Sequence, residues 1–305
     1  MRKVLSIILL FLGSFLLVGG LIARFWVPGQ VEKTPLNVNS VTRLSGDAQL
    51  FDGTALQPTP VKATSVTHSD TSKSDGSVVV MQSSSCLVKD PDGTAPDCVS
   101  ADDPDKRLVS AGTDVFATDR VTALAVNDAT YLPADAKKHE GLINKFPFHP
   151  EKADYKFWDG LTSRGVPATF QGEEDLDGVA TQKYVVRIVD GDITIGEDAG
   201  KYSTEKTMWV DAVTGSILKQ SEHQTRSMAA SGQTVLDLNF AFTPDTVAKN
   251  VADAKANANK LTLLTTTVPL VGLVGGVLAL FGGFVLRQSE VRTEEGSRHR
   301  VPANA

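Results

Sequence analysis

The chain of 305 residues lacks the short motifs that mark the common enzyme families. It contains no GxSxG nucleophile elbow, no HExxH zinc motif, no GxGxxG dinucleotide loop and no Walker phosphate loop. Its five histidines are scattered, at positions 68, 139, 149, 223 and 299. His139 and His149 flank an aromatic segment and could meet a carboxylate, but histidines in loops are usually solvated or structural. We therefore expect a protein that is not an enzyme and that uses no cofactor.

The chain also lacks any run of lysines or arginines. Its formal net charge is -6, from 30 Lys and Arg against 36 Asp and Glu. An acidic surface repels phosphate backbones, and binding to them needs a basic stripe. Nucleic acid is therefore excluded as a partner.

Cysteine is scarce, with Cys86 and Cys98 as the two examples. Between them lie the turn formers Pro91, Gly93 and Pro96. Because we place this segment outside the cytoplasm, where thiols oxidise readily, we expect a disulfide that pins the loop and contributes about 2 to 4 kcal/mol. The alternative is two independent buried thiols.

Charge is absent from two long apolar runs, residues 4–23 and 261–286. At about 1.5 Å per helical residue, each run covers the roughly 30 Å hydrocarbon layer of a bilayer. The sequence therefore predicts a membrane helix near each end. A cleaved signal peptide is the alternative for the first run, but Leu21 and Ala23 do not form a small-x-small cleavage site.

Basic residues at both ends predict the orientation of the two spans. Arg2 and Lys3 precede the first span, and four arginines follow the second, beginning with Arg287. Cytoplasmic flanks carry such an excess of positive charge. We expect a two-pass protein of the cytoplasmic membrane with short cytoplasmic tails at residues 1–3 and 287–305 and an extracytoplasmic domain over residues 24–260.

Glycines in the second span predict a flat packing face. Gly272 and Gly276 form a GxxxG pattern, and Gly13 and Gly20 share one face of the first span. Pairing of the two spans, an interface with another copy or another envelope protein, and simple tolerance of glycine in lipid all remain open.

The outer domain reads as a mainly antiparallel sheet, which makes the fold class α+β. Apolar residues alternate with polar ones over residues 236–242, and residues 207–210 should pair with 216–220 across a tight loop. Asp190 and Gly191 predict a hairpin turn, and the polar stretch 59–76 predicts a mobile connection or an edge hairpin. Thr243 and Pro244 predict the start of a helix that runs without a breaker into the second span.

Two segments of the outer domain allow more than one interpretation. Residues 146–160 concentrate five aromatic residues, which would either plug the end of the sheet or form a binding patch. The acidic cluster at residues 173–177, with Glu173, Glu174, Asp175 and Asp177, is either a solvated turn or a calcium site, although its spacing is not that of an EF-hand.

Three segments, FPFHPEKADYKFWDG at 146–160, GEEDLDGVATQKYVVRI at 172–188 and TMWVDAVTGSILK at 207–219, together with the short N-terminal tail and span, resemble one actinobacterial envelope family. This family, once a domain of unknown function, is now called the porin PorA family. The resemblance covers almost the whole chain and implies a pore in the envelope of mycolate-containing bacteria, without catalytic residues. Residues from 171 to about 223 also resemble LolA-type half-barrels, which hold acyl chains against a curved sheet.

These observations lead to three hypotheses of function. The first is a binding module whose outer domain captures lipid or another envelope component, with membrane lipids as the expected partners. The second is the pore that the family resemblance implies, although neither span carries a polar stripe to line water. The third is a structural scaffold in an envelope complex.

Overall fold

A computed structural model describes residues 2–298 of the chain, so His299 and the end of the expected cytoplasmic tail lie outside the described residues. The chain forms two compact units. One unit combines both ends of the chain, residues 1–32 and 257–305, and the other is the middle of the chain, Lys33–Ala256.

The unit made of the two ends is helical. It contains α1 (Arg2–Phe25), the short α2 (Pro28–Val31), the end of α3 (Pro244–Thr262), the π-helical turn η1 (Leu263–Thr267) and α4 (Val268–Arg298). Helices Lys3–Phe25 and Pro244–Ser289 are both long and apolar enough to cross a membrane. Their exposed side chains are large hydrophobics such as Phe11, Phe15 and Phe281, as lipid contact requires.

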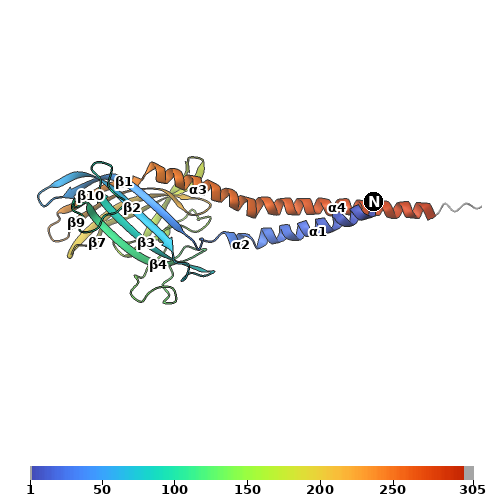
Figure 1. The fold of residues 1–305 in the computed structure, drawn as a ribbon, viewed down its shortest axis with the longest axis horizontal. Coiled ribbons are helices and arrows are strands. Elements are labelled where there is room, and N and C mark those ends of the chain that lie inside the picture. The colour runs from blue at the N-terminus through green and yellow to red at the C-terminus, as the bar shows by residue number, and fades with distance from the viewer. Residues whose placement is uncertain (1, 299–305) are drawn as a thin grey trace, which may run out of the picture. The chain divides into compact units, whose positions relative to one another are not determined.

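Helices α1 and α4 lie side by side (Figure 1), and their glycines face each other. A Cβ atom added at Gly272 would lie 3.0 Å from the Cα of Gly20, and one added at Gly276 would lie 2.9 Å from the carbonyl oxygen of Gly13. Ser6 donates a hydrogen bond of 2.8 Å to the carbonyl oxygen of Gly283 on the same interface. The GxxxG face is thus covered within the chain by the other helix.

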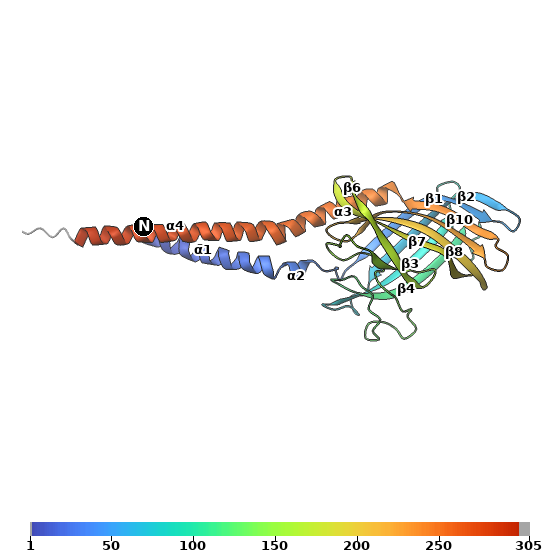
Figure 2. The same ribbon diagram turned by 180° about the vertical axis from the view of Figure 1, so that it is seen from behind.

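The middle unit is built on one ten-stranded antiparallel sheet, so the α+β prediction is confirmed. Its strands are β1 (Asn39–Phe51), β2 (Leu56–Ser69), β3 (Val78–Lys89), β4 (Leu108–Asp119), β5 (Tyr155–Asp159), β6 (Arg164–Leu176), β7 (Val179–Ile195), β8 (Asp198–Asp211), β9 (Ile217–Met228) and β10 (Thr234–Phe242). Their order is β4-β3-β2-β1-β10-β9-β8-β7-β6-β5. Two meanders therefore meet where the first strand pairs with the last, and the whole sheet is curled (Figures 1 and 2).

The loop between β4 and β5 fills the gap between the two edge strands. Thr118 on β4 bridges to Ala125, Leu124 bridges to Leu142, and Leu142 bridges to Phe157 on β5. The Leu142 amide donates to the Lys156 carbonyl at 2.8 Å, and its own carbonyl accepts from Trp158 at 2.7 Å. Because both edges find partners at this level, the curled sheet presents no free edge there for pairing with another chain.

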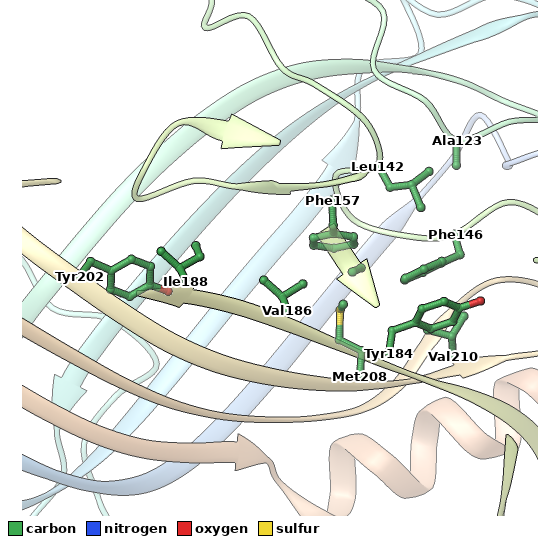
Figure 3. Packing of buried hydrophobic residues seen from close by; sticks show 11 residues of the cluster. Ala123, Leu142, Phe146, Phe157, Tyr184, Val186, Ile188, Tyr202, Met208 and Val210 are labelled. Carbon is green, nitrogen blue, oxygen red and sulfur yellow. The ribbon is translucent and has the colours of Figure 1, made fainter. Parts of the chain in front are cut away.

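The aromatic segment is part of the core. Phe146 is fully buried, and its ring centroid lies 4.5 Å from that of Tyr184 and 5.8 Å from that of Phe157 (Figure 3). Val186, Met208 and Val210 pack against the same cluster. The plug interpretation of residues 146–160 is therefore right for these rings, and the binding-patch interpretation is wrong for them.

Two local predictions for the sheet are wrong. The polar stretch at 59–76 contains most of β2, which is an interior strand between β1 and β3. Serine and threonine side chains of this strand face a polar cavity rather than solvent alone, which explains why a polar strand lies inside the sheet. Asp190 and Gly191 form a bulge inside β7, where the register shifts between Ile188 and Gly191, and the chain turns later, at Gly196. A residue with positive φ serves a bulge as well as a turn, so the local pattern does not separate the two.

The other local predictions hold. Trp209 on β8 pairs with Lys219 on β9 across the loop at residues 212–216. The hydroxyl of Thr243 accepts a hydrogen bond of 3.3 Å from the Thr246 amide and so caps the start of α3. Val251 and Ala254 of this helix pack on Val179 and Leu218 of the sheet.

The single pair of cysteines forms a disulfide between β3 and the loop that follows it. Val88 and Ala95 pack beside Cys86, so the loop covers a small apolar patch of the sheet. Arg43 on β1 and Asp97 form an ion pair of 2.6 Å that ties the same loop to a second strand.

Candidate functional site: a polar cavity on the inner face of the sheet

A cavity of about 600 Å³ opens between strands that are far apart in the sheet. Its lining includes residues of β2, β3 and β4 on one side and of β8 and β9 on the other. In the sheet order β3 and β9 are separated by β2, β1 and β10, so only the curl of the sheet brings them to face each other. The cavity is thus a product of the curvature.

One wall of the cavity is rich in hydroxyl groups. In the antiparallel register Ser65 pairs with Ser85, Thr67 with Ser83, and Ser83 with Asp114. Because side chains alternate between the two faces of a strand, these partners lie on one face. The wall therefore offers many hydroxyl donors and acceptors, beside apolar side chains such as Ala111 and Phe116.

The opposite wall carries an ion pair. Lys206 on β8 lies 3.4 Å from the carboxylate of Glu222 on β9, whose side chain is 5% exposed. The hydroxyls of Tyr202 and Thr204 also donate to this carboxylate, at 3.2 and 3.0 Å. Burial lowers the pKa of Lys206, but the nearby charges of Glu222 and Asp159 raise that pKa by more, so it lies above its ordinary value. Lys206 is therefore protonated at neutral pH.

Arg226 lies next to this pair on β9, opposite Tyr202. Its Nε donates a hydrogen bond of 3.0 Å to the amide oxygen of Gln224. Burial lowers the pKa of Arg226, although the carboxylate charges of Glu222 and Asp159 oppose this change. A guanidinium does not lose its proton at neutral pH, so the site holds a fixed positive charge.

The carboxylates of the cavity are already satisfied. Asp159 accepts hydrogen bonds from the amide and the hydroxyl of Thr162, both at 2.8 Å. Asp114 lies 2.8 Å from Nε2 of His139. Each carboxylate therefore has its own donors within the protein.

His139 is held inside the structure rather than in a solvated loop. It is 2% exposed, and its ring lies 4.6 Å from that of Trp158 and 5.8 Å from that of Phe116. It meets a carboxylate, as the sequence allowed, and thereby orients Asp114 at the cavity wall. His149 lies elsewhere, in a bend within residues 146–160, with a φ of 48° and its amide donating a hydrogen bond to the Val213 carbonyl.

The acidic cluster at residues 173–177 makes contacts of a solvated turn. Glu173 pairs with Lys152 at 2.7 Å, and Asp175 accepts from the Gly178 amide at 2.8 Å. In the part of the chain that the structure describes, no three His, Cys, Asp or Glu side chains gather in a way that could hold a metal ion.

Lys206, Glu222, Gln224 and Arg226 are the site residues that the sequence analysis missed. In the sequence they show only as polar residues at every second position, which places them on the same face of the sheet as the buried Tyr202. Alternation of polar side chains is usually attributed to solvent, and the sequence contains nothing that distinguishes a polar interior from a polar exterior.

Two helices long and apolar enough to cross a membrane, together with a curled antiparallel sheet, are features of a membrane protein with a β-rich domain. The family model of porin PorA matches residues 5–285, and the chain belongs to the porin PorA family. A comparison with curated proteins finds no match.

Proposed function

We propose that this protein is a non-enzymatic, two-pass membrane protein of the cell envelope whose outer domain binds a polar envelope component. The cavity of about 600 Å³ carries the proposal. Its volume is that of a small-molecule site, for which about 300 to 1,000 Å³ is usual. Its walls supply hydroxyl, amide and charged groups that converge on one space, which is the arrangement that fixes a polar ligand.

The class of ligand follows from the burial of the apolar side chains of the domain. Phe146, Leu236 and Leu238 could offer apolar surface to an acyl chain, but all three are buried in core clusters. Trp209 is covered by Lys219, whose Nζ lies 4.3 Å from the ring centroid. If the ligand is a lipid, it enters the cavity with its headgroup, because the acyl chain would have to desolvate the charged and hydroxyl groups of the cavity walls.

The proposed topology rests on charge and on the disulfide. Arg2 and Lys3 at one end and the arginines from Arg287 at the other favour cytoplasmic termini. The Cys86–Cys98 disulfide favours an oxidising compartment for the middle unit. Reporter fusions after Arg292 should report cytoplasm, and fusions in the loop at residues 70–77 should report the outside.

The pore is the second candidate, because the family name implies it. The contacts of the spans favour the binding module instead. The hydroxyls of Ser14 and Thr265 donate to carbonyl oxygens one turn earlier in their own helices, and Ser6 donates across to Gly283. The single O–H donor of each of these three hydroxyls is therefore committed to the backbone of the helices, and the three residues do not form a polar stripe that would line a pore.

A cavity-filling variant tests the proposal in the full chain. Gly112 lines the cavity, and a Cβ added there would meet the Ser85 hydroxyl at 3.7 Å, an ordinary contact, so the backbone tolerates a side chain here and Gly112→Phe should occupy part of the cavity. The control is Val189→Phe, which adds the same ring at a side chain that is 80% exposed. Detergent-purified protein is examined by mass spectrometry for co-purified lipids and small molecules, and by thermal shift with soluble sugars, anions and short-chain lipids.

We expect a saturable rise in melting temperature that survives in the Val189 variant and disappears in the Gly112 variant. Equal binding by both variants would contradict the cavity as the site. Absence of any bound or co-purified polar ligand would leave the scaffold hypothesis in its place.

A further inference from the structure

The charged side chains that line the cavity balance in number but differ in their partners. The cations are Lys137, Lys206 and Arg226, and the anions are Asp114, Asp159 and Glu222. The three carboxylates accept hydrogen bonds from His139, from Thr162, and from Tyr202 and Thr204. The formal charges of these six side chains cancel, so the cavity is distinguished by the hydrogen-bond donors that remain free and not by a net charge.

Arg226 and Lys137 are the cavity cations without an ion pair among the described residues, and Arg226 is half-buried whereas Lys137 is exposed to water. A guanidinium carries five N–H donors, and the hydrogen bond of Arg226 within the described chain runs from Nε to the neutral amide of Gln224. Arg226 lines the cavity, and its two Nη groups have no hydrogen-bond partner among the described residues. Lys206, in contrast, is committed to Glu222 at 3.4 Å.

A partly buried cation with free donors is costly unless an anion completes it. Burial withdraws water from the guanidinium, as the lowered pKa of Arg226 shows, and Arg226 cannot neutralise itself at neutral pH. The planar fork of an arginine matches the oxygens of a carboxylate or a phosphate, with two parallel hydrogen bonds. The hydroxyls of Ser83 and Ser85 on the opposite wall can complete the remaining oxygens.

We infer that the cavity binds an oxyanion, a phosphate or a carboxylate, through Arg226. This inference rests on the proposed function, because it names the ligand class of the same cavity. The shared chemistry is the anionic group, which a lipid headgroup and a free anion can both supply.

Three variants distinguish the effect of the positive charge of Arg226, the effect of its two-pronged guanidinium geometry and the effect of removing any arginine. Arg226→Gln removes the charge, and Arg226→Lys keeps the charge but not the fork. Arg187→Gln is the matched control, because Arg187 is an exposed arginine paired with Glu205 at 2.8 Å away from the cavity. Full-length protein in a neutral detergent at low salt is titrated calorimetrically with inorganic phosphate, acetate, dihexanoyl phosphatidylglycerol and tetramethylammonium.

Phosphate or acetate should bind the wild type and the Arg187 variant equally. The Arg226→Gln variant should bind the anion roughly 10- to 100-fold more weakly, as loss of charged hydrogen bonds implies, with Arg226→Lys between the two. Stronger binding of dihexanoyl phosphatidylglycerol than of phosphate would identify the source as a lipid headgroup. The reverse order would identify a free anion.

Stability distinguishes a binding role from a structural one. If Arg226 serves a ligand, Arg226→Gln leaves the melting temperature of the unliganded protein unchanged or higher, because an incompletely paired charge is removed. Unchanged anion binding by the Arg226→Gln variant, or binding of tetramethylammonium in place of the anions, would overturn the inference. Binding of neutral sugars in the cavity without any anion binding would overturn it while leaving the proposed function intact.

Discussion

Gly276 on α4 lies directly against Leu17 on α1. A Cβ atom at Gly276 would lie 2.8 Å from the backbone nitrogen of Leu17 and 2.9 Å from the carbonyl oxygen of Gly13. Backbone atoms cannot move aside without shifting a helix. Gly275, the next residue, would place its Cβ 3.8 Å from a methyl group of Leu16, which is an ordinary contact.

Alanine at these two adjacent glycines should therefore have unequal effects. Gly276→Ala should destabilise the helix pair by about 1 to 3 kcal/mol through overpacking, whereas Gly275→Ala should be close to neutral. Both variants are compared by thermal unfolding of the full chain in detergent. An equal loss for the two would show that the contact between α1 and α4 does not depend on the face that contains Gly276.

The ion pair in the cavity predicts strong coupling between two strands. Lys206→Met or Glu222→Gln alone should each lower the free energy of unfolding by about 3 kcal/mol, because each leaves a charge in the cavity without its partner. The double variant should lose less than the sum. A double-mutant cycle by denaturant unfolding measures this coupling, and strictly additive losses would show that the pair is not coupled.

Lys145 predicts a pH-dependent stability. Burial lowers its pKa to about 8 in spite of the opposing charge of Asp211, and its Nζ lies 4.1 Å from the ring centroid of Phe148. The unfolded chain keeps this proton up to the ordinary pKa near 10.5, so between about pH 8 and 10.5 the unfolded state binds more protons and stability rises with pH. The rise attributable to this lysine is about 3 kcal/mol at most.

Unfolding measured across this pH range checks the sign. Lys145→Met should stabilise the protein at pH 7 and flatten the rise, whereas Lys152→Met at an exposed position should leave it in place. If Lys145→Met instead destabilised the protein at pH 7, the charge of Lys145 would be well solvated in the folded state.

The disulfide should stabilise mainly through the unfolded chain. Cys86 and Cys98 are 12 residues apart, and closing a loop of this length contributes about 3 kcal/mol in the chain-entropy model. The variant Cys86→Ala, Cys98→Ala should lose about this amount in chemical denaturation and gain susceptibility to proteolysis in the loop at residues 90–106. If peptide mapping of the native protein finds both thiols open to alkylation without a reductant, the bond does not form in the cell.

The apolar faces of the spans predict that the purified protein opens no stable water-filled channel in planar bilayers. The outward side chains of α1 and α4 are large hydrophobics such as Phe11 and Phe281, and a pore wall of this kind would lose its water. Single-channel recording is the measurement. Reproducible conductance steps that vanish in a Gly276→Leu variant would restore the pore as the function.

Much of the architecture could be read from the sequence, because it depends on local or compositional signals. The spans need only uninterrupted apolar runs, and the start of α3 needs only Thr243 and Pro244. The hairpin that pairs Trp209 with Lys219 needs only alternation and a short loop. The bulge at Asp190 was mistaken for a turn, because both use the same backbone conformation.

The candidate site was beyond the reach of local patterns. Ser83 and Arg226 are far apart in sequence and on strands that do not pair, and they line one cavity because the pairing of β1 with β10 joins two meanders into one curled sheet. Each wall alone is a strand with alternating polar residues, which is also the pattern of a solvent-facing strand. The sequence by itself determined the two long apolar helices, the antiparallel pairing and the cysteine pair, since these follow from composition and short spacings. Only the tertiary structure decided that the aromatic segment fills the core while Lys206, Glu222 and Arg226 line an open polar cavity, because the curvature of the whole sheet sets which face is inside.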